Sequence, residues 1–328
     1  MPGLITHYIF GKGVLAALPP NAAADIQKHR QLFNIGCQGP DMFFYYVTAA
    51  FKKDLRGLGG RMHKENVGAF MKAMACGITE LKGDEKRAAF AYFSGYLAHY
   101  ALDCSAHPYV YYRTGFLRSG EKGSKMEYSG YHVRFETAVD VLLLKAMEGK
   151  RPGDEKIWKL VSVDKQEVVK AADYLSESIS DAYDVVLSGK NVSSAMAYMA
   201  LFKKIFQSGR GMRKKLLGAA EKLILRHNVV TELIHPQEIT DDLDYLNENK
   251  NSWRNPWDED SLRQENFAEL FEAARIEAAK LITALWEYTK GRLPLKEFLE
   301  LAGDRSFDSG RPISERVEFK VNDIIFRR

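Results

Sequence analysis

Apolar residues recur at three- and four-residue spacing through most of this 328-residue chain, which is the spacing of one face of an α-helix. The pattern predicts helices over residues 22–33, 67–81, 86–102, 135–147, 168–187, 195–206 and 262–288. Helix-forming residues fill these stretches, and Gly and Pro interrupt the chain between them. Only the segment Arg316–Asn322 has the alternating pattern of a strand. We therefore predict an all-α fold, a multi-helix bundle with one candidate short strand near the C-terminus.

The composition excludes several classes of protein. The net charge of +4, from 47 basic and 43 acidic residues, is too balanced to indicate a nucleic-acid-binding protein by itself. No run of about 18 apolar residues occurs, so we expect no integral membrane segment. The three cysteines form no CxxC pair, and the first 25 residues lack the basic and apolar regions of a secretory signal. These features predict a cytoplasmic protein with reduced thiols.

Two histidine–carboxylate pairs carry the clearest chemical signal. His99 and Asp103 are four residues apart, and so are His132 and Glu136. Residues at this spacing lie on one face of a helix, about one turn from each other. The helix backbone then holds an imidazole and a carboxylate at a fixed separation, as a chelating pair for a metal ion. Because both pairs fall within 38 residues, we predict a metal site.

Further candidate ligands surround these pairs. His107 lies four residues after Asp103, but Pro108 disfavours helical geometry in the residue before it, so we expect the helix to end near His107. Upstream stand three more candidates, His7, Asp41 and His63. Nitrogen and oxygen ligands without thiolate suit zinc best, ahead of manganese and iron. The remaining histidines are predicted to have other roles: His29 solvated on a helix surface, His227 and His235 in surface or packing positions.

In the order and spacing of these residues, the chain resembles the bacterial zinc-dependent phospholipases C over residues 1 to about 145. The motifs that match are an early His, an Asp after a Gly-rich turn, a following His, then His-x3-Asp with a further His, and finally His-x3-Glu. The resemblance implies an all-helical fold with a multinuclear zinc site. It implies an enzyme, a phosphodiesterase that hydrolyses phosphoric esters of phospholipids.

The resemblance also implies how the ligands are shared among two to three zinc ions. One ion would take Asp41, His63, His99 and Asp103. A second would take His107, His132 and Glu136. A third would take His7, Asp103 as a bridge, and backbone groups at the start of the chain, where Met1-Pro2 stands in place of the family's terminal Trp.

Three functions remain open at this point. The S1/P1-type nucleases share the same ligand plan, so the ligands do not choose between lipid and nucleic acid. A metal-binding interaction protein without turnover is the third alternative. Clustered divalent ions suit a phosphodiester because they neutralise its charge and activate water. In that chemistry, Asp41 could also serve as the base for the attacking water.

Other features bear on substrate and organisation. The aromatic run of Phe43, Phe44, Tyr45 and Tyr46 directly follows Asp41 and is a candidate substrate-binding wall. Residues 203–226 carry eight basic residues and one acidic residue among apolar ones, a pattern compatible with peripheral membrane contact or a solvated helix face. We expect a catalytic metal-binding core over residues 1–150, further helices over 151–310 and a tail over 311–328.

Overall fold

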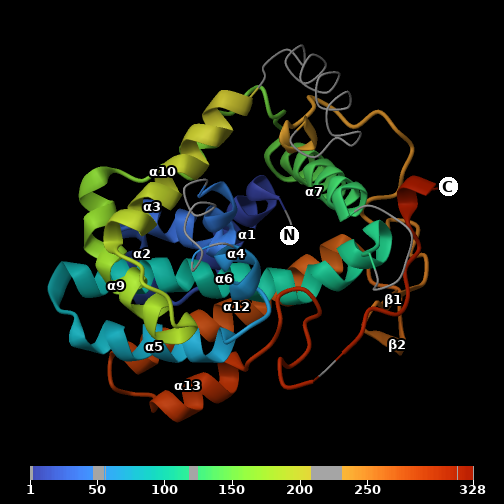
Figure 1. The fold of residues 1–328 in the computed structure, drawn as a ribbon. Coiled ribbons are helices and arrows are strands. Elements are labelled where there is room, and N and C mark those ends of the chain that lie inside the picture. Colours follow the sequence, from blue (N-terminus) through green and yellow to red (C-terminus); the bar gives the residue numbers. More distant parts are fainter. Residues whose placement is uncertain are drawn as a thin grey trace.

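The structure is a computed structural model that describes residues 3–46, 55, 57–117, 125–207, 231–315 and 317–327. Helices dominate it, which confirms the predicted all-α class (Figure 1). In chain order they are α1 (Leu4–Ala16), α2 (Pro20–Lys28), α3 (Arg30–Gly36), the 3-10 helix η1 (Gly39–Tyr45), α4 (Leu58–Met62), α5 (Val67–Glu80), α6 (Gly83–Thr114), α7 (Lys125–Glu148), α8 (Ile157–Leu160), α9 (Lys165–Tyr183), α10 (Gly189–Phe206), η4 (Thr231–Leu233), α12 (Phe267–Thr289), α13 (Leu295–Ala302) and η5 (Ile325–Arg327). None of these helices is long and apolar enough to cross a bilayer.

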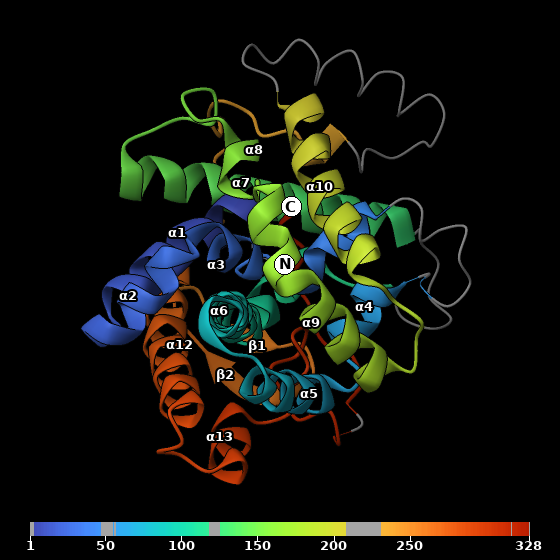
Figure 2. The same ribbon diagram turned by 90° about the vertical axis from the view of Figure 1, so that its left-hand side faces the viewer.

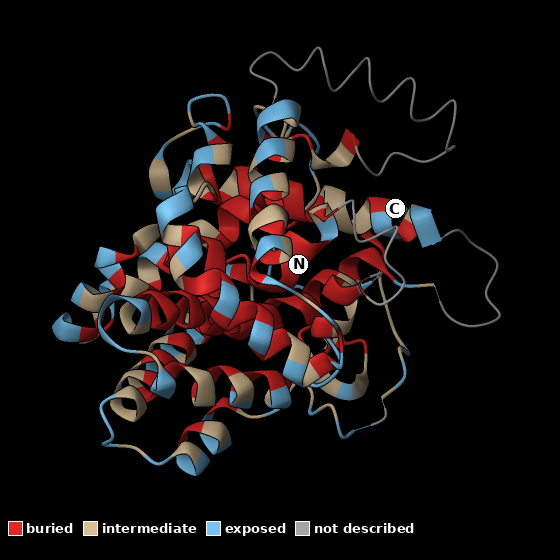
Figure 3. Cartoon of the chain, turned by 60° about the vertical axis from the view of Figure 1, so that its left-hand side comes forward, coloured by how far each residue is buried: buried red, intermediate tan, exposed pale blue. Residues whose placement is uncertain are grey.

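Helix α6 is the centre of the fold. Figure 2 looks along its axis and shows α3, α9, α5 and α12 arranged around it. Every residue from Ala88 to Cys104 is buried, because α6 carries small and aromatic residues on all its faces rather than one apolar stripe. Buried residues therefore concentrate in the interior of the molecule (Figure 3). The histidine–aspartate pair of α6 consequently lies at the middle of the hydrophobic core.

Facing glycines allow α3 to lie close against α6. A Cβ atom at Gly95 would come within 2.2 Å of the Phe33 carbonyl oxygen, and one at Gly36 within 2.3 Å of that of Tyr92. The close crossing brings the next element, η1, against α6 as well. Gly39, at φ +49°, opens η1, and a Cβ there would lie 2.3 Å from the His99 ring. The glycines of this segment thus place η1 directly beside the α6 histidine.

Proline does not end α6 as predicted. The helix continues through Pro108 to Thr114, so the expected end near His107 is wrong. Pro108 removes one helical N–H, the one that would pair with the Cys104 carbonyl, while the buried side chains of Tyr109 and Val110 hold the next turn in place. His107 therefore stays in register with the other ligand candidates of α6.

His29 lies inside the protein, which corrects the prediction of a solvated side chain. It occupies the break between α2 and α3 and is 3% exposed. Its Nδ1 lies 2.7 Å from Glu167 and its Nε2 lies 3.2 Å from Asp84. The break turns the imidazole inward, where it joins the starts of α6 and α9 through two carboxylates.

The candidate strand at Arg316–Asn322 is not formed in its described part, residues 317–322. The two strands that the described residues do form are β1 (Trp253–Asn255) and β2 (Asp258–Arg263), an antiparallel pair. The Lys320 N–H donates to the Pro256 carbonyl in the turn of this hairpin, at 2.7 Å. Pro256 has no N–H with which to donate a hydrogen bond back to this segment. The segment therefore cannot extend the hairpin as a third strand at this point.

One contiguous hydrophobic core joins the early and late parts of the chain. Residues of α1, α3, α5 and α6 share it with residues of α9, α10 and α12. The length of α12 lies along α6 (Figure 1). The predicted boundary at residue 150 falls in the turn between α7 and α8. The division of the chain into a catalytic core, further helices and a tail stays a prediction.

Candidate metal centre

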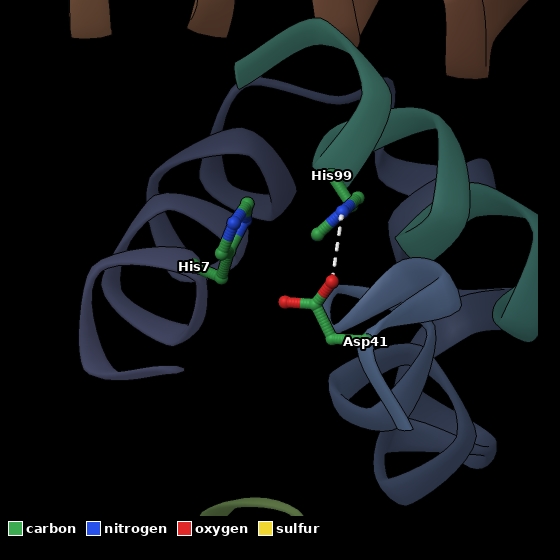
Figure 4. Close-up of side chains that lie close together, drawn as sticks. All are labelled: His7, Asp41 and His99. Carbon is green, nitrogen blue, oxygen red and sulfur yellow. Dashed lines mark ion pairs between the residues drawn. The ribbon is translucent and has the colours of Figure 1, made fainter. Parts of the chain in front are cut away.

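All eight predicted ligands converge at the middle of α6. They come from five places along the chain: α1, η1, the residue after α4, α6 and α7. Their ligand atoms form three groups in which all atoms lie within 4.8 Å of one another: His7 with Asp41 and His99, His63 with His99 and Asp103, and His107 with His132 and Glu136. Figure 4 shows the first group, with side chains from α1, η1 and α6 pointing toward one another. The structure thus brings together residues that are up to 129 positions apart.

The Asp103 carboxylate belongs to the second group and also faces His7 of the first. Its Oδ1 lies 3.2 Å from His7 Nε2, and its Oδ2 lies 3.0 Å from His99 Nε2 and 3.9 Å from His63 Nε2. Asp41 closes the arrangement, with Oδ1 3.2 Å from His63 Nε2 and 3.9 Å from His99 Nε2. Since the two oxygens of Asp103 face different histidines, this carboxylate has the geometry of a bridge between two ions.

The third group lies one turn further along α6. His132 Nε2 is 2.8 Å from Glu136 Oε1, and His107 Nε2 is 3.9 Å from the same oxygen. The imidazole rings of His107 and His132 have centroids 5.8 Å apart. The predicted i, i+4 pairing on α7 is therefore present, and the α6 helix supplies the third donor because it continues past His107.

Carbonyl groups of the main chain fix the tautomers of three of these histidines. Nδ1 of His63 lies 2.6 Å from the Gly59 carbonyl, that of His99 3.1 Å from Cys37, and that of His107 2.8 Å from Phe307. A carbonyl can only accept, so each Nδ1 carries the hydrogen and each Nε2 presents its lone pair to the centre. Backbone acceptors of this kind are the usual outer partners of metal-binding histidines.

The buried polar atoms of the first two groups test whether a cation fits. Asp103 is fully buried, and neither of its oxygens accepts a hydrogen bond from any described residue. The Nε2 atoms of His7, His63 and His99 likewise make no hydrogen bond within the described ranges. Burying a carboxylate and several lone pairs unsatisfied is costly, and a divalent cation satisfies all of them at once. The donor set therefore fits a metal ion.

Electrostatics keep most of these ligands in the form that binds metal. Burial lowers the pKa of His7, His107 and His132. Burial alone would raise the pKa of Asp103, but His107 and His99 hold it well below its usual range. Neutral imidazoles and an ionised carboxylate are the species that coordinate a cation.

His63 departs from this trend. Burial pulls the pKa of its imidazole down, but the Asp41 carboxylate at 3.2 Å offsets that effect, so the net pKa is raised. In the absence of a cation, His63 therefore retains its proton to a higher pH than the other histidines. A metal at this group must displace that proton.

Asp140, a residue that the sequence patterns did not single out, anchors the helix that carries His7. Its carboxylate accepts hydrogen bonds from the N–H of Ile5 (3.2 Å) and Thr6 (2.7 Å) in the first turn of α1, and from the Thr6 hydroxyl (2.7 Å). His235 contacts the same carboxylate at 2.7 Å, which gives it the packing role predicted for it. Asp140 lies one turn after Glu136 on the same face of α7. That four-residue spacing is the sequence feature from which its position near the centre could have been predicted.

The aromatic run after Asp41 divides into buried and exposed members. Phe43 and Tyr46 are buried, and Asn191 donates to the Tyr46 hydroxyl at 2.7 Å. Tyr45 packs on Phe202. Phe44 is 55% exposed, and its ring stacks on that of His63 with centroids 5.5 Å apart. Among the four candidates, Phe44 is the one placed beside the ligand groups and open to solvent.

Some predictions fall outside the described residues. Met1 and Pro2 lie outside them, so the backbone ligands of a third ion stay a prediction, although His7 faces Asp103 as that site requires. His227 and most of the basic stretch 203–226 also lie outside the described part.

Fold and site together define a helical protein whose buried histidine and carboxylate groups suit several divalent ions. Comparison with protein families identifies the family to which the chain belongs. The model of zinc-dependent phospholipase C matches residues 6–189, more than half of the chain and a range that holds all eight predicted ligands. The chain therefore belongs to the zinc-dependent phospholipase C family. Comparisons with curated proteins and with solved structures give no significant match.

Replacing the bridging carboxylate tests the geometry of the centre. Asp103→Asn should lose more than one equivalent of zinc, because both oxygens face histidines of different groups and an amide nitrogen cannot bind a cation. The matched control is Asp181→Asn, an exposed carboxylate on α9 outside the centre and the segments that support it. Zinc content after equilibrium dialysis gives the answer. If Asp103→Asn binds as much zinc as the parent, Asp103 is not a bridge.

The lowered histidine pKa values predict acid sensitivity of the metal-free protein. A buried histidine with a lowered pKa stabilises the fold above the ordinary value of 6.5, and this contribution is lost as pH falls. The raised pKa of His63 has the opposite effect on the pH dependence of stability, but it is one group against three histidines with lowered pKa values. Each unit of pKa difference is worth about 1.4 kcal/mol. Chelator-treated protein should therefore melt at lower temperature at pH 5.5 than at pH 7.5.

The variant His107→Gln removes one of the three groups and should show a shallower dependence of melting temperature on pH. A melting temperature of the metal-free parent that stays constant or rises between pH 7.5 and 5.5 would contradict the assignment of neutral, buried imidazoles.

Proposed function

We propose that this protein is a zinc-dependent phosphodiesterase of the phospholipase C type, acting on phospholipid with two to three zinc ions. Family membership supports the zinc dependence and the lipid substrate. The observation that carries the proposal is the gradient of exposure across the ligand groups. The side chain of Asp103 is fully buried, whereas those of Asp41, Glu136 and His132 are 9%, 12% and 15% exposed. We infer that a substrate phosphate approaches the centre past these three more exposed side chains.

Zinc ions bound in these groups would neutralise the phosphodiester charge and lower the pKa of water. The residues of the chain supply the remaining requirements. The Nε2 lone pairs are already aimed by main-chain carbonyls, so the ligands need little reordering. The Asp41 side chain is more exposed than that of Asp103, and we assign Asp41 as the base that accepts the proton of the attacking water. Asp103 stays ionised in the interior and holds its histidines in place.

Phe44 is the best candidate contact for the organic part of the substrate. Its ring lies on the solvent side of His63 and is 55% exposed, so a ligand at the first group would touch it. On the side of the third group, Tyr111 packs on His132 with ring centroids 4.6 Å apart, and Phe116 packs on Tyr111 while 45% exposed. Exposed aromatic rings beside the centre suit contact with a lipid surface. Peripheral membrane contact is part of the proposal, and cytoplasmic localisation stays a prediction.

Substrate assays test the function directly. With zinc, the protein should hydrolyse phospholipid in mixed micelles and release a phosphorylated head group, and a chelator should abolish the reaction. Asp41→Asn keeps an oxygen ligand but loses the proton acceptor, so kcat should fall about 100- to 10,000-fold. Single-stranded DNA should stay intact.

The other outcomes each select an alternative. Cleavage of single-stranded DNA without lipid turnover would identify a nuclease instead. Zinc binding with neither reaction would identify a metal-binding protein without turnover.

The role of Phe44 has its own test. Phe44→Ala removes a stacked ring worth about 0.5–1.5 kcal/mol, which corresponds to a KM for phospholipid raised about 2- to 12-fold with kcat little changed. The control Ile276→Ala truncates an apolar side chain that is 60% exposed on α12, away from the centre, and should leave KM unchanged. Equal KM values for Phe44→Ala and the parent would remove Phe44 from the substrate site.

A further inference from the structure

The segment Gly303–Gly310, which we name the C-terminal strap, follows α13 and returns to the metal centre. It lies more than 100 residues beyond the range matched by the family. It nevertheless reaches α6 at the turn that carries Asp103 and His107, because Ser306 contacts Cys104 and His107 contacts Phe307. Distant parts of the chain thus meet at the ligands.

The main chain of Phe307 contacts one ligand from each side of the centre. Its N–H donates to the His63 carbonyl at 2.8 Å, and its carbonyl accepts the Nδ1–H of His107 at 2.8 Å. His63 belongs to the group around Asp103, and His107 to the group with Glu136. One residue therefore fixes the position of a ligand in both groups.

The side chain of Phe307 fills the space behind the same histidines. It is fully buried, and its ring centroid lies 5.2 Å from that of His63 and 5.6 Å from that of His99. Tyr96 and Tyr100 close the other sides at 5.9 and 5.2 Å. The ring excludes water from the buried face of the ligands and prevents the imidazoles from rotating away.

Next in the chain, Asp308 extends these contacts to the third group. The Tyr111 hydroxyl donates to Asp308 Oδ1 at 3.4 Å, and the Tyr111 ring packs on His132 with centroids 4.6 Å apart. The strap therefore supports His132 through Tyr111, in addition to its direct contacts with His63 and His107.

Both ends of the strap are tied down. Asp304 accepts the Gly68 N–H at 2.8 Å, and Arg305 Nε donates to the Tyr100 hydroxyl at 3.0 Å. At the other end, Asn255 donates to the Ser309 carbonyl at 3.0 Å. These ties hold Phe307 against α6 from two sides.

The docking point of the strap coincides with the irregularity in α6. Pro108 leaves the Cys104 carbonyl without its helical N–H, and Gly310 lies against that carbonyl. Gly310 has φ +66°, and a Cβ there would come within 2.3 Å of the Cys104 oxygen. A side chain at this position would force the strap away from the helix.

We propose that the C-terminal strap is a positioning element of the metal centre, in which Phe307 orients His63 and His107 and locks His107 as its Nδ1–H tautomer. The inference rests on the proposed zinc site but not on the reaction that the site performs. Outer partners of metal-binding histidines contribute about 10- to 100-fold in metal affinity, and the strap should contribute in that range.

Displacing the strap gives the first test. Gly310→Ala should lower the zinc affinity of the full-length protein about 10- to 100-fold, measured by competition with a chromophoric chelator. Gly291→Ala is the matched control, because Gly291 also has a positive φ (+72°) but nothing within 4 Å of its Cβ position. It carries the same backbone strain and should bind zinc as the parent does. Equal affinity of Gly310→Ala and the parent overturns the proposal.

A spectroscopic test on the parent protein is decisive whether or not Gly310→Ala folds. In metal-free protein labelled with ¹⁵N-histidine, the His107 resonance, assigned from its loss in His107→Gln, should show a protonated Nδ1. In Gly310→Ala the two tautomers should interconvert. A protonated Nε2 in the parent overturns the proposal even if Gly310→Ala fails to fold. A parent that binds zinc but hydrolyses neither substrate refutes the proposed function and leaves the role of the strap supported.

Discussion

The burial of the Asp103 carboxylate among histidines is the interaction on which the rest of the site depends. An isolated carboxylate in a protein interior is unfavourable by several kcal/mol, and this one accepts no hydrogen bond from the described residues. His7, His63 and His99 surround it at 3.0 to 3.9 Å. A helix buried on every side places this charge in the core, and the facing glycines of α3 and α6 let η1 come close enough to add a second carboxylate. The fold therefore places a strongly cation-binding group where water cannot compete.

Preorganisation explains how residues from five separate elements act as one site. Three histidines are held by carbonyls of three different segments, those of Gly59, Cys37 and Phe307. A carboxylate on α7, Asp140, holds the first turn of α1 and so fixes the approach of His7. Local opening of the segment around Phe307 should therefore weaken His63 and His107 together.

Sequence patterns could predict which histidines and carboxylates come together on α6 and α7, because spacing alone determines which side chains share a helix face. The histidine–carboxylate pairs on α6 and α7 can be predicted from the helical repeat alone, without knowledge of the tertiary structure. The helix through Pro108 could not be predicted, since packing of Tyr109 and Val110 outweighs one lost hydrogen bond. The inward position of His29 depends on Asp84 and Glu167, which are distant in sequence. The role of Phe307 rests on main-chain contacts, which leave no signature in residue type.

The proposed metal centre differs from a network of buried ion pairs in one observable property, which is bound zinc. Anomalous scattering from a zinc-loaded crystal, recorded on both sides of the zinc absorption edge, tests it most directly. We predict one peak among His63, His99 and Asp103 and another among His107, His132 and Glu136, each within bonding distance of the Nε2 atoms. A well-measured map without peaks at these positions would contradict the proposed metal centre.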